Sequence, residues 1–347
     1  MTAVRLRDLR PDDHDALAAG LGDRFVRTEV PQIRAGGGDV LVIAEPESDR
    51  LLGSVALDRV VPARGQAEIG CWVRPADRGR GVGTAALRAL AGRAFAAGLA
   101  RLELITHGED PFGQRAAMAA GFQREGVRRG AAPNPDGGRD DLLVFTRLAT
   151  DPPGPVARAL PDLPGGELTD GVITLRPLTV ADLDFYAALH READVVATTV
   201  PPVPPSPAEM RRRCGWAAAN WLAGQRADLV ITDAATGTPA GEIGLFYQEP
   251  PTAQAMIGYS MLPAWRGRGF PTRAAQLVAL WAFAETSIAR LIAGALPTNL
   301  GSQRVLEKAG FRREAYLRSR LPGPDGTRYD DVQFVLLPED VVDRLGL

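Results

Sequence analysis

The strongest constraint on the fold of this chain is an internal repeat. Four segments of the first half recur in the second half, in the same order and at nearly the same spacing. The pairs are residues 6–13 with 175–182, 78–84 with 266–272, 114–122 with 303–311, and 135–141 with 324–331. Chance explains one such match but not a collinear series, so the chain is predicted to hold two copies of one fold.

A proline- and glycine-rich stretch separates the two copies. Residues 152–155 read PPGP and residues 163–166 read LPGG, a composition that does not hold regular helices or strands. We therefore expect an N-terminal domain over residues 1–149, a linker over residues 150–166 and a C-terminal domain over residues 167–347. The total of 347 residues suits two domains of ordinary size.

Both copies show the same order of predicted elements. Three runs that read as strands precede a glycine-rich loop, a helix and a further strand. The strand runs are residues 40–44, 51–57, 67–73 and 102–105 in the first copy, and 229–232, 241–247 and 256–261 in the second. The Pro-Asp-Gly sequences at Pro135 and Pro324 read as hairpin turns. This order predicts an α+β fold with a mixed, mainly antiparallel sheet flanked by helices, and not a doubly wound parallel sheet.

The glycine-rich loop is the main functional signal. In each copy it follows a strand and opens a helix, and its glycines let backbone N–H groups point into one concavity. The first helical turn adds free N–H donors and the positive end of the helix dipole. Such a loop can bind a phosphate or pyrophosphate. A single copy could equally be a solvated turn, but two copies in the same context favour the phosphate.

Several kinds of phosphate site are excluded. A Walker loop needs a lysine, and Lys308 is the only lysine in the chain. A dinucleotide site needs three spaced glycines in a parallel strand–helix–strand unit. The formal charge of −2, with no basic run, disfavours nucleic acid as a partner.

The numbers of cysteines and histidines and the length of the apolar stretches disfavour metal sites, disulfides and a membrane location. Cys71 and Cys214 cannot form a disulfide framework or a four-ligand zinc site, and the three histidines lack metal-ligand spacing. No stretch approaches the ~20 apolar residues of a membrane-spanning helix. We therefore expect a cytoplasmic protein with no metal and no membrane partner. The oligomeric state stays open.

The loops resemble the pyrophosphate loop of the GNAT family of acetyl-CoA-dependent N-acetyltransferases, and so the resemblance covers both halves. Arg78, Gly81 and Gly83 match the family pattern fully, whereas in the second loop Pro271 replaces the last glycine. Proline has no N–H, so weaker binding is expected there. The resemblance implies two tandem GNAT-like domains. It also implies that acetyl-CoA is bound by Val73, Arg78, Gly79, Arg80, Gly81, Val82, Gly83 and Thr84, and by Met261, Leu262, Arg266, Gly267, Arg268, Gly269, Phe270, Pro271, Thr272 and Asn299.

The second half also resembles the branch of the family that acetylates protein amino termini. Residues 299–311 (NLGSQRVLEKAGF) carry the pattern Asn-x-x-Ser-x-Arg-x-x-Glu-Lys-x-Gly-Phe. In that branch Asn299 and Ser302 would approach the pantetheine arm and sulfur of CoA. A tyrosine that is frequent in the family is replaced by Leu306 here and by Ala117 in the first half.

The expected catalytic groups are divided between the halves. Glu68 lies on the strand before the first loop, where GNAT-like sequences often carry the base; it could instead be a solvated carboxylate. Met256 takes that place in the second half. Glu242 and Tyr259 are weaker candidates for base or water contacts. Ser302 could protonate the departing thiolate or simply cap a helix.

A helix is predicted over residues 208–224, in the region that covers the acceptor site in this family. Its tryptophans, Trp216 and Trp221, could shape a pocket or belong to the core. The acceptor itself is expected to be a primary amine, either a protein amino terminus or a small molecule.

The sequence therefore predicts direct acetyl transfer to an amine, with Asn299, Ser302 and Glu68 as candidate catalytic residues and the C-terminal domain as the catalytic copy. Two alternatives stay open at this stage. The N-terminal domain could be the active copy, or the protein could bind acyl-CoA without turnover.

Overall fold

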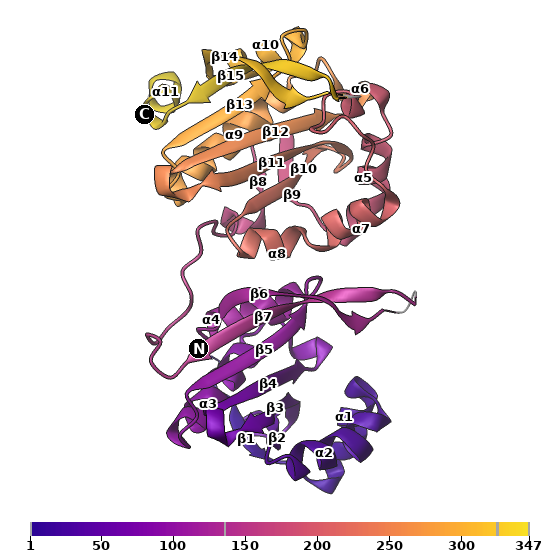
Figure 1. Ribbon diagram of the computed structural model, residues 1–347, viewed down its shortest axis with the longest axis vertical. Helices are drawn as coiled ribbons and strands as arrows, with labels where there is room; N and C mark the ends of the chain where they lie inside the picture. Colours follow the sequence, from indigo (N-terminus) through magenta and orange to yellow (C-terminus); the bar gives the residue numbers. More distant parts are fainter. Residues whose placement is uncertain (1, 135–136, 324–325, 346–347) are drawn as a thin grey trace. The chain divides into compact units, whose positions relative to one another are not determined.

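The computed structural model describes residues 2–134, 137–323 and 326–345 and forms two compact units, Met1–Ala157 and Arg158–Leu347 (Figure 1). The first two residues of each expected Pro-Asp-Gly turn, 135–136 and 324–325, lie outside the described residues. The division between the units lies within the stretch expected to be the linker.

Each end of this proline-rich stretch is bound to its own unit. The backbone N–H of Val156 donates to the carbonyl oxygen of Met118 at 2.9 Å. Leu160 is fully buried in the core of the second unit, and Trp221 Nε1 donates to the carbonyl oxygen of Pro161 at 2.9 Å. Prolines prevent a regular element here, but single apolar side chains still bury on the neighbouring core.

The N-terminal unit contains one seven-stranded sheet in the order β1-β2-β3-β4-β5-β7-β6. Its strands are β1 (Arg5–Asp8), β2 (Asp39–Ala44), β3 (Leu51–Val61), β4 (Gln66–Val73), β5 (Arg101–His107), β6 (Gln123–Pro133) and β7 (Arg139–Leu148). Its helices are α1 (His14–Leu21), α2 (Val30–Ala35), α3 (Val82–Ala96) and α4 (Pro111–Ala119).

The C-terminal unit contains an eight-stranded sheet in the order β14-β15-β13-β12-β11-β10-β9-β8. Its strands are β8 (Leu168–Thr169), β9 (Ile173–Pro177), β10 (Arg226–Asp233), β11 (Pro239–Glu249), β12 (Gln254–Met261), β13 (Arg290–Ala295), β14 (Arg312–Pro322) and β15 (Arg328–Leu336). Its helices are α5 (Leu183–Leu189), α6 (Ala193–Val196), α7 (Pro207–Gly215), α8 (Ala217–Leu222), α9 (Phe270–Glu285), α10 (Leu300–Ala309) and α11 (Pro338–Leu345).

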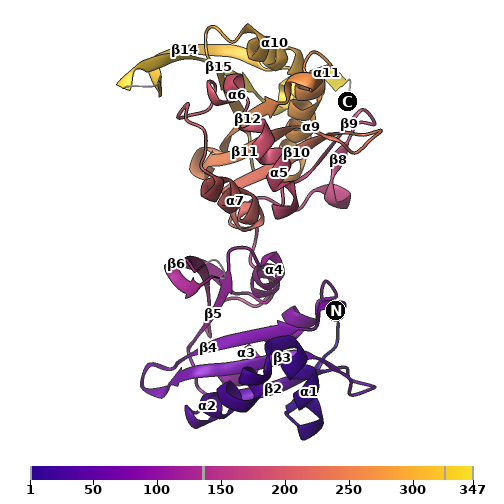
Figure 2. The ribbon, with the colours of Figure 1, turned by 90° about the vertical axis from the view of Figure 1, so that its right-hand side faces the viewer.

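The prediction of two α+β domains with mixed, mainly antiparallel sheets is confirmed. Among the described strands, β4 pairs with β5 and β12 pairs with β13 in parallel, and the other pairs are antiparallel. In Figure 1 the β6–β7 hairpin projects beyond its sheet, and Figure 2 shows the same for β14. Each parallel pair is joined through a crossover helix, α3 or α9, as this connection requires.

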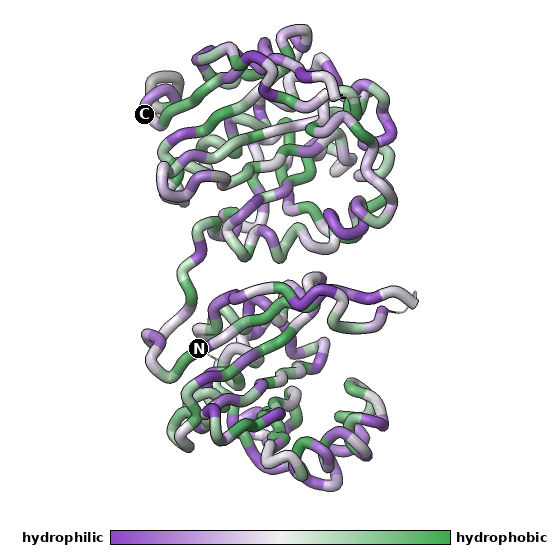
Figure 3. The backbone as a smooth tube through the Cα atoms, viewed as in Figure 1, coloured by the Kyte–Doolittle hydropathy of each residue, from purple (hydrophilic) through white to green (hydrophobic). Residues whose placement is uncertain are grey.

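The core of the C-terminal unit shows how α9 is held on the sheet. Val278 and Ala282 of α9 are fully buried in one cluster with Ile243 of β11 and Ile257 of β12. In Figure 3 the hydrophobic colour likewise follows the central strands of both units. Apolar side chains at helical spacing thus bury one face of α9 against alternating side chains of the strands.

The two parallel strand pairs separate after three residues. Glu68 on β4 is opposite Glu103 on β5, but the rest of β4 has no described partner on that side. In the same way β12 pairs with β13 only as far as Met256. Each sheet therefore opens into a wedge beside the loop, where backbone N–H and C=O groups of β4 or β12 are free to bind another molecule.

An ion pair is repeated at the first strand of each unit. Arg7 contacts both carboxylate oxygens of Asp13 at 2.7 and 2.8 Å, and Arg176 contacts both oxygens of Asp182 at 2.9 and 2.6 Å. Each aspartate also accepts a backbone N–H three residues earlier. The bidentate geometry fixes the turn from strand to helix in the same way in both copies.

The helix expected over residues 208–224 is divided into α7 and α8 at Trp216. Trp216 and Trp221 are both buried, and Trp221 packs against Trp281 with ring centroids 5.6 Å apart. Of the two expected roles, the structure therefore gives these tryptophans the core one.

Candidate acetyl-CoA site and reaction centre

The two glycine-rich loops have the same backbone conformation. Gly79 and Gly81 have φ values of +73° and +80°, and Gly267 and Gly269 repeat these values. Gly81 is the N-cap of α3 and Gly269 is the N-cap of α9. Residues other than glycine rarely adopt this left-handed region, so the loop geometry depends on these positions.

The first arginine of each loop is tied to the end of the preceding strand. Arg78 Nε donates to the carbonyl oxygen of Val73 at 3.1 Å. Arg266 donates to the carbonyl oxygen of Met261 through Nε at 3.2 Å and Nη2 at 2.9 Å, and it also pairs with Asp194 on α6. These arginines therefore hold the loop against the strand.

The second arginine of each loop is anchored differently in the two units. Arg80 forms an ion pair with the buried Asp77 at 3.0 Å. Arg268 instead lies 4.8 Å from the ring centroid of Trp265, which occupies the position of Asp77. One loop is thus held by charge pairing and the other by a cation–π contact.

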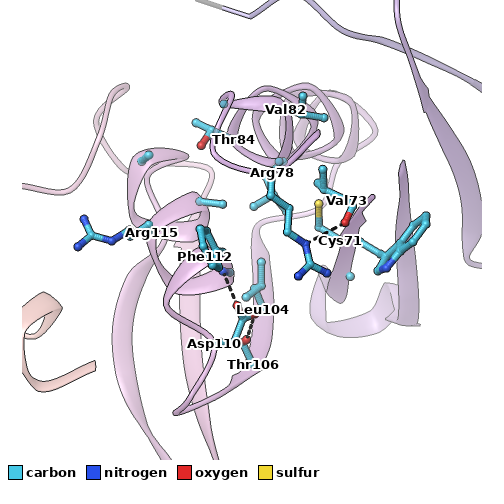
Figure 4. A pocket seen from close by; sticks show the side chains of 18 of the residues that line it. Cys71, Val73, Arg78, Val82, Thr84, Leu104, Thr106, Asp110, Phe112 and Arg115 are labelled. Carbon is cyan, nitrogen blue, oxygen red and sulfur yellow. Dashed lines mark hydrogen bonds between the residues drawn. The ribbon is translucent and has the colours of Figure 1, made fainter. Parts of the chain in front are cut away.

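A cavity of about 490 Å³ opens beside the N-terminal loop (Figure 4). Its size suits a small-molecule site. It is lined by seven of the eight residues predicted there: Val73, Arg78, Gly79, Gly81, Val82, Gly83 and Thr84. Arg80 is not among the lining residues. The fit to acetyl-CoA rests on these loop glycines and on the free edge of β4, because both present backbone N–H groups.

The far wall of this cavity carries a polar pair from β5 and the start of α4. Thr106 Oγ1 donates to Asp110 Oδ2 at 3.0 Å, and Asp110 Oδ1 accepts the backbone N–H of Gly113 at 3.0 Å (Figure 4). A side chain at Gly113 would overlap Asp110. Burial raises the pKa of the nearby Cys71 thiol to about 12, so it is not a thiolate nucleophile at neutral pH.

The positions of Cys71 and Gly113 are taken in the C-terminal unit by Tyr259 on β12 and Ser302 on α10, which carry two hydroxyl groups. Tyr259 Oη and Ser302 Oγ lie 2.9 Å apart, and Asn299 Oδ1 accepts the backbone N–H of Ser302 at 3.0 Å. Asn299 is therefore the N-cap of α10, and the alternative in which Ser302 caps the helix is wrong. Burial raises the pKa of Tyr259 to about 12, so the phenol is protonated and can donate to Ser302 Oγ or to the carbonyl oxygen of Ser302 at 3.2 Å.

The other predicted loop residues of the C-terminal unit lie at the strand end and the first helical turn. Met261 and Phe270 are buried, and Phe270 packs on Trp265 at 5.4 Å between ring centroids. Pro271 lies within the first turn of α9. Leu262, Gly267 and Thr272 complete the segment at the end of β12 and the start of α9.

Glu68 lies where the N-terminal wedge opens, outside the residues that line the cavity. It pairs with Arg59 at 2.8 Å and lies opposite Asp58 in the sheet. Burial raises the pKa of its carboxyl above the usual range. Such a shift brings a carboxylate closer to the working range of a general base.

Sequence reasoning missed a pair formed by a buried histidine and a partly buried glutamate in the C-terminal unit. His190, at the end of α5, places Nε2 3.0 Å from Glu242 Oε1 on β11. The two residues are 52 positions apart, so no local spacing indicates the contact. Among the described residues, no group of three or more His, Cys, Asp or Glu side chains could hold a metal ion.

The comparisons with known proteins agree with this architecture. The acetyltransferase (GNAT) domain family matches residues 4–123 and, separately, residues 173–312. These matches cover more than half of the chain, which therefore belongs to the GNAT acetyltransferase family. The prediction of two tandem GNAT-like domains is confirmed.

Two curated relatives come from Bacillus subtilis (strain 168). The probable N-acetyltransferase YjcK is 42% identical over 86 residues, which are 25% of this chain and 48% of that protein. The uncharacterized N-acetyltransferase YnaD is 31% identical over 84 residues, 24% of this chain and 49% of that protein. The chain thus spans about half the length of the curated relatives it matches.

Solved structures are similar to about half of the chain. Mycobacterium smegmatis RimJ in complex with CoA-disulfide is 21% identical, with a TM-score of 0.44, over 52% of this chain and 93% of that one.

No described helix of the present chain is long and apolar enough to cross a membrane.

Proposed function

We propose that this protein is an acetyl-CoA-dependent N-acetyltransferase that transfers an acetyl group directly to a primary amine, with the C-terminal domain as the catalytic copy. The observation that carries this proposal is the hydrogen bond between Tyr259 and Ser302 beside the wedge of β12 and β13. The N-terminal unit has Cys71 and Gly113 at the corresponding positions. Family membership and the two glycine-rich loops support the choice of donor.

The reaction has three requirements, and groups of the C-terminal unit suit each one. An alkylamine is protonated at neutral pH and must lose a proton before it attacks. The oxyanion of the tetrahedral intermediate needs donors, which free N–H groups of β12 can supply. The thiolate that departs needs a proton, which Ser302 can donate while Tyr259 donates in turn to Ser302.

Asn299 contributes position more than chemistry. Its side chain fixes the first turn of α10 and therefore the direction of Ser302. The loop residues 266–272 would hold the pyrophosphate of the donor through their backbone N–H groups, with one donor fewer at Pro271. No covalent enzyme intermediate is needed.

A second candidate places catalysis in the N-terminal unit. The cavity of about 490 Å³ beside residues 78–84 favours donor binding there. Glu68 at the mouth of the wedge would be the base, and Thr106, on the far wall of the cavity, would supply the hydroxyl for a departing thiolate. The N-terminal unit would then be an active copy or an acetyl-CoA-binding copy without turnover.

The test is thiol release from acetyl-CoA with a panel of amines: peptides that begin with alanine or serine, polyamines and aminoglycosides. Turnover with at least one of these classes is expected. Loss of activity in Ser302→Ala with retention in Glu68→Gln would place catalysis in the C-terminal domain. Acetyl-CoA binding without turnover for every acceptor would contradict the enzyme proposal and favour a binding protein.

A further inference from the structure

The sheet face of the C-terminal unit that points away from α9 carries an ordered set of side chains on three strands. Val230 of β10, Glu242 of β11 and Ser260 of β12 lie opposite one another in the sheet. The next row is Asp228, Gly244 and Gly258. Cross-strand neighbours of this kind lie ~5 Å apart and share one face.

Helices α5 and α7 cover the β10 end of this face. Tyr186 of α5 and Met210 of α7 bury Val230 in one apolar cluster. The cover places His190, which follows α5, directly against Glu242. His190 is 7% exposed and the Glu242 side chain is 16% exposed, so the carboxylate keeps some access to solvent while the imidazole does not.

The hydrogen-bonding pattern of His190 indicates its tautomer. Nδ1 is buried and has no partner among the described residues, whereas Nε2 contacts Glu242. A buried N–H without an acceptor is costly, so a proton on Nε2 rather than on Nδ1 is favoured. In that form His190 donates to Glu242 and fixes the direction of its carboxylate.

The neighbouring carboxylate is already engaged by cations. Asp228 Oδ1 accepts from Arg213 at 2.8 Å and from Arg226 at 2.5 Å. Glu242, in contrast, has His190 as its one hydrogen-bond partner in the described part of the chain. Glu242 is therefore the carboxylate of this face that is held by an imidazole and not by arginines.

One glycine leaves β12 open on this face, between Glu242 and the wedge. A side chain at Gly258 would meet nothing closer than Phe246 at 3.9 Å, and Gly258 is exposed. Its cross-strand neighbour Gly244 is buried, with Asp228 and Phe246 packed close to it. Gly258 is two residues from Ser260, the cross-strand partner of Glu242, so an amine that reaches β12 at Gly258 lies near Glu242.

Ser302, the proposed proton donor for the thiolate, lies beside the opposite face of β12. Because side chains alternate along a strand, Tyr259 points to the face opposite that of Gly258 and Ser260. Tyr259 contacts Ser302 on that opposite face. A group on one face of β12 can thus take a proton from the amine while Ser302 on the other face protonates the sulfur.

We propose, on the basis of the function proposed above, that Glu242 is the general base of the C-terminal domain and that His190 is a positioning residue that holds it. Glu242 removes one proton from the ammonium group. The nitrogen forms the new C–N bond, the C–S bond breaks, and Ser302 protonates the thiolate. The second nitrogen proton restores Ser302, and Glu242 passes its proton to solvent. The products are the acetylamide, free CoA thiol and one proton.

The experiment uses the full-length protein and two acceptors. One is a peptide amide that begins with alanine, whose amine must be deprotonated. The other is hydroxylamine, which is mostly unprotonated at neutral pH and does not require a base. Glu242→Gln and His190→Gln are compared with wild type, and Glu249→Gln is the matched control because Glu249 is an exposed residue of the same strand.

Loss of the base is expected to lower kcat/KM of Glu242→Gln for the peptide by about 100-fold, with only a few-fold loss for hydroxylamine. His190→Gln is expected to lose about tenfold on the peptide, because misplacement of a catalytic group is costly. The kcat/KM of Glu249→Gln should match that of the wild type for both acceptors. The affinity for acetyl-CoA, measured by calorimetry, should be the same in every variant as in the wild type.

Other outcomes would overturn the assignment. Equal losses on the two acceptors would show that Glu242 is structural, and an unchanged peptide rate in Glu242→Gln would remove it from the mechanism. Loss of the peptide activity in Glu68→Gln instead would move the base to the N-terminal domain. If the wild-type protein binds acetyl-CoA but acetylates neither acceptor, the proposed function itself fails and this assignment fails with it.

Discussion

The N-terminal and C-terminal domains have the same framework but different side chains at the wedge. Both have the Arg–Asp pair at the first strand, the left-handed glycines of the loop and a parallel pair that opens after three residues. At the wedge, Cys71, Thr106 and Gly113 in one domain take the places of Tyr259, Ala295 and Ser302 in the other. The comparison teaches that a backbone framework can be retained while the side chains beside it, here those proposed for proton transfer, change.

The carboxylates on the acceptor side also differ between the domains. The N-terminal domain has Glu68 on β4, at the start of the wedge, paired with Arg59. The C-terminal domain has Met256 at that position and has Glu242 one strand further, held by His190. The second copy therefore has a different candidate base, on β11 and level with Ser260 of β12, four residues beyond Met256.

The largest expected effect on activity distinguishes the hydroxyl group of Ser302 from that of Thr106. Ser302→Ala removes the proton donor for the thiolate, so kcat should fall by about 100-fold while acetyl-CoA affinity changes little. Thr106→Val, the matched change in the N-terminal domain, should leave kcat near wild type. Steady-state kinetics with the best acceptor checks both, and the reverse pattern would identify the N-terminal domain as the catalytic copy.

The next effect concerns donor binding. Gly81→Val and Gly269→Val each force a β-branched residue into a left-handed conformation, at a cost of about 1–2 kcal/mol or more. Each change should weaken binding at its own loop by at least about tenfold. Calorimetry with acetyl-CoA should resolve two sites in the wild type and one in each variant. If the wild type shows one site only, the variant that loses binding identifies the loop that binds acetyl-CoA.

A third test uses the pH dependence of the C-terminal domain. Burial raises the pKa of Asp228 to about 7, above its unfolded value near 4, although Arg213 opposes the shift. The stability that Asp228 contributes is thus full at low pH and is lost as pH rises from about 4 to about 7, by on the order of 3 kcal/mol. Thermal unfolding of wild type and Asp228→Asn across this range should show a slope that the variant lacks. If the stability of the wild type and of Asp228→Asn changes with pH in the same way, the predicted contribution of Asp228 is wrong.

The smallest expected effect concerns Asp77 in the N-terminal domain. Its contribution to stability depends on pH in the opposite direction from that of Asp228. Hydrogen bonds from Arg50 lower the pKa of the buried Asp77, so its contribution is full above its unfolded pKa and is lost as pH falls through the lower folded value. Asp77→Asn should destabilise this domain by about 1–2 kcal/mol, since its partners are largely exposed. The C-terminal domain, with Trp265 at this position, gives the comparison. Urea unfolding at neutral pH measures the difference in the free energy of unfolding between wild type and Asp77→Asn. Equal values would show that the ion pairs of Asp77 are not needed to hold the loop.

Much of the fold was predictable from the sequence because its signals are local or repeated. The strands before each loop, the helices after Gly81 and Gly269 and the two-domain organisation all followed from spacing and turn residues. The division of residues 208–224 at Trp216 was not predictable, because the break depends on how α7 and α8 pack on the sheet. The docking of Leu160 into the core was missed for the same reason.

The sequence by itself determined the family, the loops that would hold acetyl-CoA and the presence of Asn299 and Ser302. Only the tertiary structure decided that Tyr259, 43 residues away, hydrogen-bonds to Ser302, and that His190 is placed on Glu242. The physical reason is that a motif is read along one chain segment, whereas these pairs depend on strand register and on which face a helix covers. A shift of one residue in either strand would turn Glu242 or Tyr259 to the opposite face and separate each pair.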